Sequence, residues 1–191
     1  MSILVFATHN PKKILELRSL LKDDFTVLSA SELAIPEPEE TGQTMEENSA
    51  LKANFVFDHC KQASLADDSG LEVDALDGRP GVFSARYAGE PRNDLANMHK
   101  VIMELGEETR RNAQFRTILT YRDEHGMHQF EGVVRGTLLH QPRGEMGFGY
   151  DPIFVPDGES RTFAEMELNE KNLYSHRARA FKKFLTFIQS E

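Results

Sequence analysis

Two adjacent acids, Asp67 and Asp68, follow an apolar stretch of the chain and precede Ser69-Gly70. Adjacent carboxylates repel each other unless a cation or hydrogen-bond donors compensate their charge. Magnesium bound to phosphate is the natural cation, because it prefers oxygen ligands and keeps several of its waters. Glu39 and Glu40 lie in an acidic loop that can add a carboxylate to the same ion. An Asp-Ser-Gly turn and an exposed acidic loop are the alternative interpretations.

A second polar group, Thr8, Asn10 and Lys13, lies where the first predicted strand passes into the first predicted helix. Its hydroxyl, amide, ammonium and backbone N–H groups can converge on phosphate oxygens at the positive end of that helix. By spacing alone, the same residues also fit a Thr/Asn turn followed by a solvated lysine. Both interpretations stay open at this point.

A glycine-rich segment, Gly147-Phe148-Gly149-Tyr150-Asp151-Pro152, places two aromatic rings and an acid between and after glycines. Glycines let the backbone approach a ligand closely, and an exposed ring stacks on a planar base. Phe148 is the better candidate for stacking, because Tyr150 also fits an aromatic plug in the core. The segment therefore predicts a site for a flat, partly apolar ligand.

Three basic residues, Lys171, His176 and Arg177, gather just before and inside the last predicted helix. They can meet phosphate or base oxygens, or they can form a solvated basic helix start. The other histidines show no metal-ligand spacing. The sequence contains no GxxxxGK[ST], HExxH, GxSxG or CxxC motif, which excludes P-loop, zincin and hydrolase-elbow interpretations.

Length and charge limit the class of protein. The 191 residues fit one domain, or two closely packed lobes, and we expect one catalytic domain over residues 1–191 without a separable linker. The formal net charge is 22 minus 31, or -9, which argues against a nucleic-acid polymer as partner. No apolar run is long enough to span a membrane. A lone Cys60 and a start without a basic leader region predict a cytoplasmic location.

The elements that must position these residues follow from hydrophobic spacing and turn chemistry. Apolar runs predict strands over residues 2–7, 26–29, 64–66, 113–122, 127–139 and 153–155, with a turn at Asp68-Ser69-Gly70. Helical spacing and capping patterns predict helices that begin near Pro11, Thr44, Leu95 and Ser175. Strands and helices in this order predict an α/β fold with a mixed sheet, helices at both ends of the sequence and an inserted hairpin.

Seven ordered motifs give the sequence a nearly end-to-end resemblance to the inosine/xanthosine triphosphate pyrophosphatase family. They are ATHNPKK (7–13), EETG (39–42), ENSALKA (47–53), ADDSGLEVDAL (66–76), PGVFSARYAG (80–89), GFGYDPIF (147–154) and EKNLYSHRARA (170–180). The resemblance implies an elongated, two-lobed α/β fold with a cleft between the lobes, a homodimer and a divalent ion, Mg²⁺. It also implies cleavage of deaminated purine nucleoside triphosphates to a monophosphate and pyrophosphate.

The resemblance also implies a role for each site residue. Asp68 is expected to be the general base and, with Glu40, a magnesium ligand. The expected substrate-binding residues are Thr8, Asn10, Lys13 and Lys52 at the phosphates, and Ser69, Phe148, Gly149, Tyr150, Asp151, Lys171, His176 and Arg177 elsewhere on the nucleotide. Phe148 is expected to stack on the purine, while Lys171, His176 and Arg177 hold the base. His9 departs from the family, in which many members carry glycine there.

Two other functions compete with this interpretation. A module that binds purine triphosphates without hydrolysing them explains the phosphate-binding residues, but gains nothing from two acids at the phosphate. A carboxylate-pair hydrolase of glycosidic or ester bonds explains Asp68 and Glu40, but not the lysines in the same loops. In-line attack of water on the α-phosphorus, with Asp68 as the base, accounts for both sets of residues.

Overall fold

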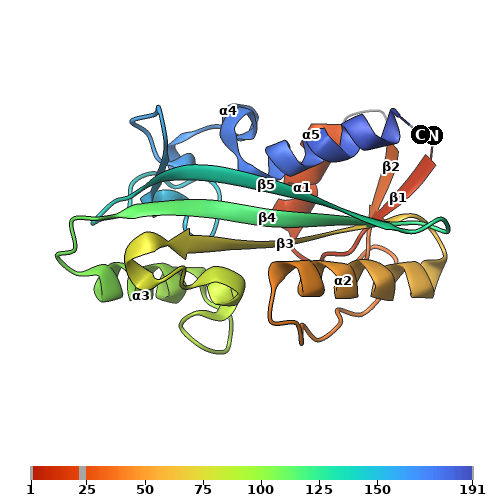
Figure 1. The fold of residues 1–191 in the computed structure, drawn as a ribbon, viewed down its shortest axis with the longest axis horizontal. Helices are drawn as coiled ribbons and strands as arrows, with labels where there is room; N and C mark the ends of the chain where they lie inside the picture. The colour runs from red at the N-terminus through yellow and green to blue at the C-terminus, as the bar shows by residue number, and fades with distance from the viewer. Residues whose placement is uncertain (1, 22–24, 191) are drawn as a thin grey trace. The chain divides into compact units, whose positions relative to one another are not determined.

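The structure is a computed structural model that describes residues 2–21 and 25–190 (Figure 1). Its strands are β1 (Ser2–Phe6), β2 (Phe25–Ser29), β3 (Ser64–Val73), β4 (Asn112–Arg122), β5 (Met127–Leu138) and β6 (Phe154–Pro156). Its α-helices are α1 (Pro11–Leu21), α2 (Met45–Cys60), α3 (Asp94–Leu105), α4 (Leu168–Tyr174) and α5 (His176–Ile188). None of the helices in these described ranges combines the length and apolarity that a membrane crossing requires.

The six strands form one sheet in the order β2-β1-β3-β4-β5-β6. Strand β1 runs parallel to both β2 and β3, whereas β5 and β6 are antiparallel. Parallel neighbours need crossover connections, and α1 and α2 supply them. The prediction of an α/β fold with a mixed sheet and flanking helices is confirmed, and so is the hairpin that joins β4 to β5.

The chain divides into two compact units. Unit 1 consists of Met1–Asp68, Thr117–Gly132 and Arg177–Glu191, and unit 2 consists of Ser69–Arg116 and Val133–His176. Strands β3, β4 and β5 each contribute residues to both units. The single catalytic domain and the cleft expected from the sequence stay predictions.

In unit 1 the two faces of the sheet carry different helices. On one face, side chains of β1 and β3 pack with α1 and α5, in a core that includes Leu4, Phe6, Leu65, Leu17 and Phe181. On the other face they pack with α2, in a core that includes Val5, Ala7, Ala66, Ala53 and Val56. Successive residues of a strand point to opposite faces. Residues 65 and 67 of β3 therefore face α1 and α5, while residues 66 and 68 face α2.

Unit 2 has a separate core. It includes Leu71, Val73, Met98, Val101, Phe115, Phe154 and Phe163, all buried. Helix α3 begins at the N-cap Asn93 and faces this core with Met98, Val101 and Leu105. Leu95, near which the sequence predicts the start of this helix, is 66% exposed and lies outside the core.

The predicted turn at Asp68-Ser69-Gly70 was wrong. Strand β3 does not stop at residue 66 but continues to Val73, so both acids lie within a strand. Asp-Ser-Gly favours turns locally, but this segment belongs to a strand that neighbours β4 in the sheet and continues into buried Leu71 and Val73. Tertiary pairing outweighs the local turn preference here.

Local signals predicted the helix starts better. Pro11 is the first residue of α1, where its missing N–H costs no hydrogen bond. Thr44 caps α2 in a capping box with Glu47, as the sequence predicts. The helix ends at Cys60.

Candidate active site

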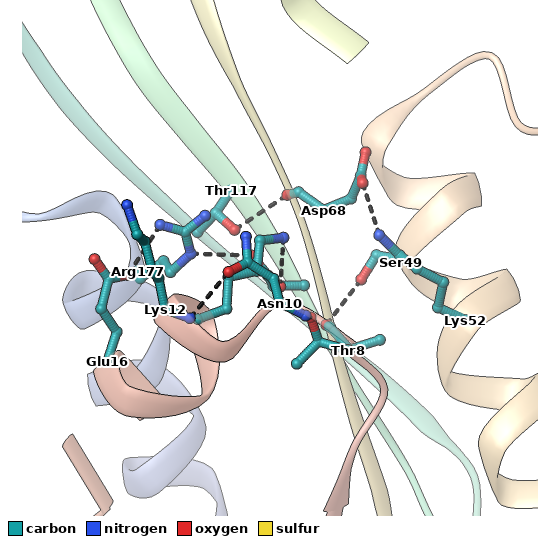
Figure 2. Close-up of polar contacts among 12 residues, drawn as sticks. Thr8, Asn10, Lys12, Glu16, Ser49, Lys52, Asp68, Thr117 and Arg177 are labelled. Carbon is teal, nitrogen blue, oxygen red and sulfur yellow. Dashed lines mark hydrogen bonds and ion pairs between the residues drawn. The ribbon is translucent and has the colours of Figure 1, made fainter. Parts of the chain in front are cut away.

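The two acids in the middle of β3 lie on opposite faces of the sheet. Figure 2 shows Asp68 turned toward Lys52 of α2, and Arg177 of α5 on the side of α1. Asp67 accepts hydrogen bonds from Lys13 Nζ at 2.9 Å and from Arg177 Nε at 3.0 Å. Hydrogen-bond donors therefore compensate the two adjacent charges, which is one of the two possibilities that the sequence leaves open. The strand gives each carboxylate its own cationic partners.

The Asp67 network, which we define as Asp67, Lys13, Arg177 and Glu16, contains two acids and two cations, all of them buried except the half-buried Lys13. Arg177 Nη1 donates to Glu16 Oε2 at 3.0 Å, and Glu16 is only 6% exposed. Burial opposes ionisation of Asp67, but Lys13 and Arg177 outweigh it and hold the pKa of Asp67 far below its ordinary value. Burial, together with the charge of Arg177, lowers the pKa of Lys13 despite the contact with Asp67.

Glu16 is a site residue that the sequence analysis missed. It lies beside Leu17, a residue of the apolar face of α1, and the signal that could have found it is an acid next to that face. An ionised carboxylate is rarely buried without a partner. Its burial therefore predicts a cation nearby, which the structure identifies as Arg177.

The Asp68 cluster, which we define as Asp68, Glu40 and Lys52, lies on the opposite face of β3. Lys52 Nζ donates to Asp68 Oδ1 at 2.8 Å and to Glu40 Oε1 at 2.7 Å. Burial lowers the pKa of Lys52, but the two carboxylates outweigh it, and the pKa is raised overall. Burial raises the pKa of Asp68, and its contact with Lys52 offsets this only in part. The cluster therefore pairs a permanent ammonium with a carboxylate that is more basic than an ordinary aspartate.

The donor set of the Asp68 cluster fits a divalent ion that also binds substrate. No group of three or more potential metal-ligating side chains occurs in residues 2–21 and 25–190. Mg²⁺ is usually held by one or two carboxylates together with substrate phosphates and waters, rather than by an all-protein cage. Glu40 and Asp68 lie within hydrogen-bond distance of one lysine nitrogen, so their oxygens are close enough to share a cation.

The loop between β1 and α1 forms a tight polar turn. Thr8 Oγ1 accepts a hydrogen bond from Asn10 N at 3.2 Å, and Asn10 Oδ1 accepts one from Lys12 N at 3.0 Å. Strand order reverses beside β1, and in open α/β sheets ligands bind at the carboxyl ends of strands near such a point. A tight turn at Thr8 and Asn10 is thus compatible with phosphate binding. The phosphate-binding role stays a prediction.

His9 lies in the same loop and reaches the segment that leads to Glu40. Its Nε2 lies 2.9 Å from the carbonyl oxygen of Ile35. A carbonyl only accepts, so Nε2 carries the proton and donates. The His9 side chain therefore ties the loop between β1 and α1 to residue 35.

In unit 2 the glycine-rich segment is held by a buried ion pair. Lys171 Nζ donates to Asp151 Oδ2 at 2.7 Å, and both residues are buried. The same oxygen accepts from Phe148 N at 2.9 Å, and the ammonium lies 5.1 Å from the Phe148 ring centroid. Gly147 has φ +75°, and a Cβ there would come within 2.1 Å of Asp151 Oδ2. This segment therefore requires a glycine at residue 147.

The remaining predicted residues of unit 2 are also fixed. Tyr150 is buried and donates its hydroxyl to Ser84 O at 2.8 Å, as the core-plug alternative expects. Burial raises the pKa of this phenol. His176 stacks on Phe115 with ring centroids 4.9 Å apart, and Gly149 N donates to Asp94 Oδ2 at 3.1 Å. Ser69 is half-buried in β3.

The three basic residues grouped by the sequence analysis are divided between the two units. Lys171 and His176 belong to unit 2, where they contact Asp151 and Phe115. Arg177 belongs to unit 1, where it contacts the two acids of the Asp67 network. Its predicted role at the base stays a prediction.

The fold and the Asp68 cluster together define an α/β protein with a buried carboxylate–lysine centre at the middle of a mixed sheet. The model of the Ham1 family matches residues 4–187. A dITP/XTP pyrophosphatase of Flavobacterium psychrophilum is 46% identical over 188 residues, which is 98% of this chain and 99% of that protein. One of Caulobacter vibrioides is 50% identical over 184 residues, with 94% of each chain covered.

Solved structures agree with these relatives. The Ham1 protein of Staphylococcus aureus superimposes with a TM-score of 0.89 at 37% identity, covering 99% of both chains. A HAM1 protein from Coxiella burnetii gives a TM-score of 0.91 at 36% identity over the whole of both chains. The chain belongs to the Ham1 family.

Proposed function

We propose that this protein hydrolyses deaminated purine nucleoside triphosphates, such as those of inosine, deoxyinosine and xanthosine, to the monophosphate and pyrophosphate. The curated relatives named as dITP/XTP pyrophosphatases support this activity. The structural observation that carries it is the Asp68 cluster, in which a buried, unusually basic carboxylate and a second acid share one lysine. A general base and a charge-neutralising group are what the hydrolysis of a phosphoric anhydride requires.

In this mechanism Asp68 takes a proton from a water molecule whose oxygen forms a bond to the α-phosphorus. The bond from that phosphorus to the oxygen bridging to the β-phosphate breaks, and pyrophosphate leaves with the electron pair. The raised pKa of Asp68 brings the base closer to neutral pH, which favours proton transfer. Lys52 and Lys13 supply positive charge to the phosphate oxygens, and Thr8 and Asn10 supply polar groups beside the start of α1.

A divalent ion completes the proposed site, and Glu40 and Asp68 are the residues that would hold it. When bound, such an ion neutralises phosphate charge and lowers the pKa of coordinated water. We propose Mg²⁺, because a site of two carboxylates plus phosphate oxygens suits it.

We also propose which residues recognise the base. Phe148 would stack on the purine, and the Lys171–Asp151 pair holds the backbone of the Phe148 segment in place. Donors from Lys171, His176 and Arg177 would pair with the 6-oxo group of hypoxanthine or xanthine. An adenine 6-amino group would leave those donors unpaired, which selects against adenosine triphosphate. Ser69, Gly149 and Tyr150 complete the proposed substrate-binding set.

We also propose a cytoplasmic homodimer that acts on free nucleotides rather than on nucleic-acid polymers. The net charge of -9 disfavours a polyanionic partner.

One assay tests the function directly. Deoxyinosine triphosphate is incubated with the protein, with and without Mg²⁺, and pyrophosphate and orthophosphate are measured separately. We expect pyrophosphate that depends on the ion. Orthophosphate as the first product would place attack at the γ-phosphorus, and tight binding without either product would favour the non-hydrolytic binding module.

A further inference from the structure

The loop that carries Glu40 is joined to α2 at two points. One is the ion pair between Glu40 and Lys52, at 2.7 Å. The other is a hydrogen bond from Gly42 N to Asn48 Oδ1, at 2.8 Å. Asn48 and Lys52 are four residues apart in α2, so their side chains leave the same face of the helix one turn apart. The loop that carries Glu40 is therefore attached to α2 at both Lys52 and Asn48, next to the Asp68 cluster.

The burial of Asn48 is unusual for its residue type. Its exposed fraction is 0%, although asparagine is mostly found at protein surfaces. Its orientation follows from its partner, because Gly42 N is a donor and only the amide oxygen can accept from it. The Nδ2 group then points elsewhere, and it finds no hydrogen-bond partner among the residues that the structure describes. A buried donor without a partner lowers the stability of the fold. The favourable contribution of Asn48 is therefore the hydrogen bond that its oxygen accepts from Gly42 N.

Gly42, on the loop side of this contact, lies very close to α2. A Cβ on this residue would lie 2.6 Å from Asn48 Oδ1 and 2.8 Å from Glu47 Cβ. Real side chains do not approach this closely, so the backbone at residue 42 lies directly against the start of α2. The position of Glu40, two residues earlier, is thereby limited by a backbone contact as well as by its own ion pair.

We propose that Asn48 is a positioning residue for the hydrolysis proposed above. It fixes Gly42, and through it holds the Glu40 carboxylate beside Lys52, where Glu40 and Asp68 can act on one cation. This inference rests on the proposed function but is separate from it, since the activity could exist without any contribution from Asn48. Partners that orient a metal-binding carboxylate typically change metal affinity or activity about 10–100-fold when they are removed.

The test compares substitutions on both sides of the contact with a matched control. Asn48→Ala and Gly42→Ala should each lower kcat/KM for deoxyinosine triphosphate about 10-fold or more and raise the Mg²⁺ concentration needed for half-maximal rate. The control is Ser64→Ala, which removes another buried side-chain hydrogen bond to α2, from Ser64 Oγ to Ala53 O at 2.8 Å. It should lower the melting temperature but leave kcat/KM near the wild-type value.

A double-mutant cycle shows whether Asn48 acts through Glu40. In the Glu40→Gln background, Asn48→Ala should add less than about a twofold further loss, because the carboxylate that it positions is already gone. The same pattern is expected in calorimetric binding of an α,β-methylene analogue of inosine triphosphate with Mg²⁺, which needs no turnover. Amide exchange at Gly42 should be faster in Asn48→Ala and unchanged in Ser64→Ala.

Two outcomes are distinguishable. A wild-type protein that releases no pyrophosphate from any deaminated purine triphosphate overturns the proposed function. A wild-type protein that does so, with Asn48→Ala and Gly42→Ala as active as Ser64→Ala, or with equal losses in both backgrounds of the cycle, overturns the role of Asn48 alone.

Discussion

The Asp67 network and the Asp68 cluster begin one residue apart but differ in chemical character. Asp67 faces two cations, Lys13 and Arg177, and its pKa is lowered. Asp68 faces one cation, which it shares with Glu40, and its pKa is raised by burial. The alternation of the strand separates the two carboxylates, and the number of cations on each face decides which of them can accept a proton. We infer that Asp67 holds the site together while Asp68 reacts.

The largest expected effect is on turnover in Asp68→Asn. The amide keeps the shape of the side chain but cannot take a proton, so kcat should fall by about 10²–10⁴ while nucleotide affinity changes little. Stability at pH 7 should fall less than in Asp67→Asn, because Lys52 keeps Glu40 as an acidic partner. Steady-state kinetics and thermal unfolding of one preparation check both points. A turnover close to wild type would remove Asp68 from the mechanism.

Asp67→Asn should give the opposite balance. It leaves the buried Arg177 and the half-buried Lys13 with one acid, Glu16, and breaking a buried pair in this way lowers the free energy of unfolding by about 3–5 kcal/mol. Activity of the folded fraction should fall through a higher KM, since Lys13 and Arg177 lose their common partner. Denaturant unfolding, combined with activity normalised to folded protein, measures the two effects. If Asp67→Asn is as stable as wild type, the network does not hold the site.

The pH dependence should separate the same residues. The lowered pKa of Asp67 gives stability that is fully present above its unfolded value of about 3.9 and declines as the pH falls below it. That decline should be shallower in Asp67→Asn. The raised pKa of Asp68 should place the acid limb of kcat/KM above pH 3.9 or so, since the base must be ionised. Unfolding midpoints across a pH series check the decline in stability, and kcat/KM across the same series checks the acid limb. An acid limb that survives in Asp68→Asn would belong to another group.

A smaller effect is expected at the base. Phe148→Ala should weaken inosine and adenosine triphosphates by similar amounts, about 1–3 kcal/mol each, because stacking does not distinguish the rings. Arg177→Ala should instead narrow the ratio of their kcat/KM values, since the lost donor serves an oxo group and not an amino group. If Arg177→Ala depresses both nucleotides equally, its contacts with Asp67 and Glu16 are its whole role.

The smallest effect is expected from His9→Gly. This change removes the bond to the Ile35 carbonyl, but Ile35 is buried and its own N–H is held by Ala30 O at 2.9 Å. Only the Thr8–Asn10 turn should loosen, with a KM change of a few-fold at most and no change in kcat. A large loss of kcat would show that His9 acts beyond its own loop.

Local signals predicted much of the fold. Pro11, the Thr44 capping box and the turn between β4 and β5 mark element boundaries through interactions within a few residues, so the sequence alone is enough. The length of β3 could not be predicted in this way. Its Asp-Ser-Gly segment favours a turn in isolation, and only pairing with neighbours distant in the sequence keeps it extended.

For the candidate site, the motifs predicted which residue types are present, but not how these residues are divided between the two faces of β3. Alternation along β3 would have separated Asp67 from Asp68 once the strand was known to include them. Glu16 and Asn48 were missed because the spacing of other residues is enough to predict the helices in which they lie. Their importance comes from burial and from partners in other segments, Arg177 and Gly42, which no local pattern reveals.

The most direct test is a titration of the two side-chain carboxyls by carbon-13 NMR in the folded protein. We expect the Asp68 carboxyl to titrate above the ordinary aspartate value of about 3.9, and the Asp67 carboxyl to stay ionised to the lowest pH at which the protein remains folded. Assignment uses the Asp67→Asn and Asp68→Asn variants, each of which removes one resonance. If both carboxyls titrate together, or if Asp67 has the higher pKa, the division into a structural and a reactive aspartate is wrong.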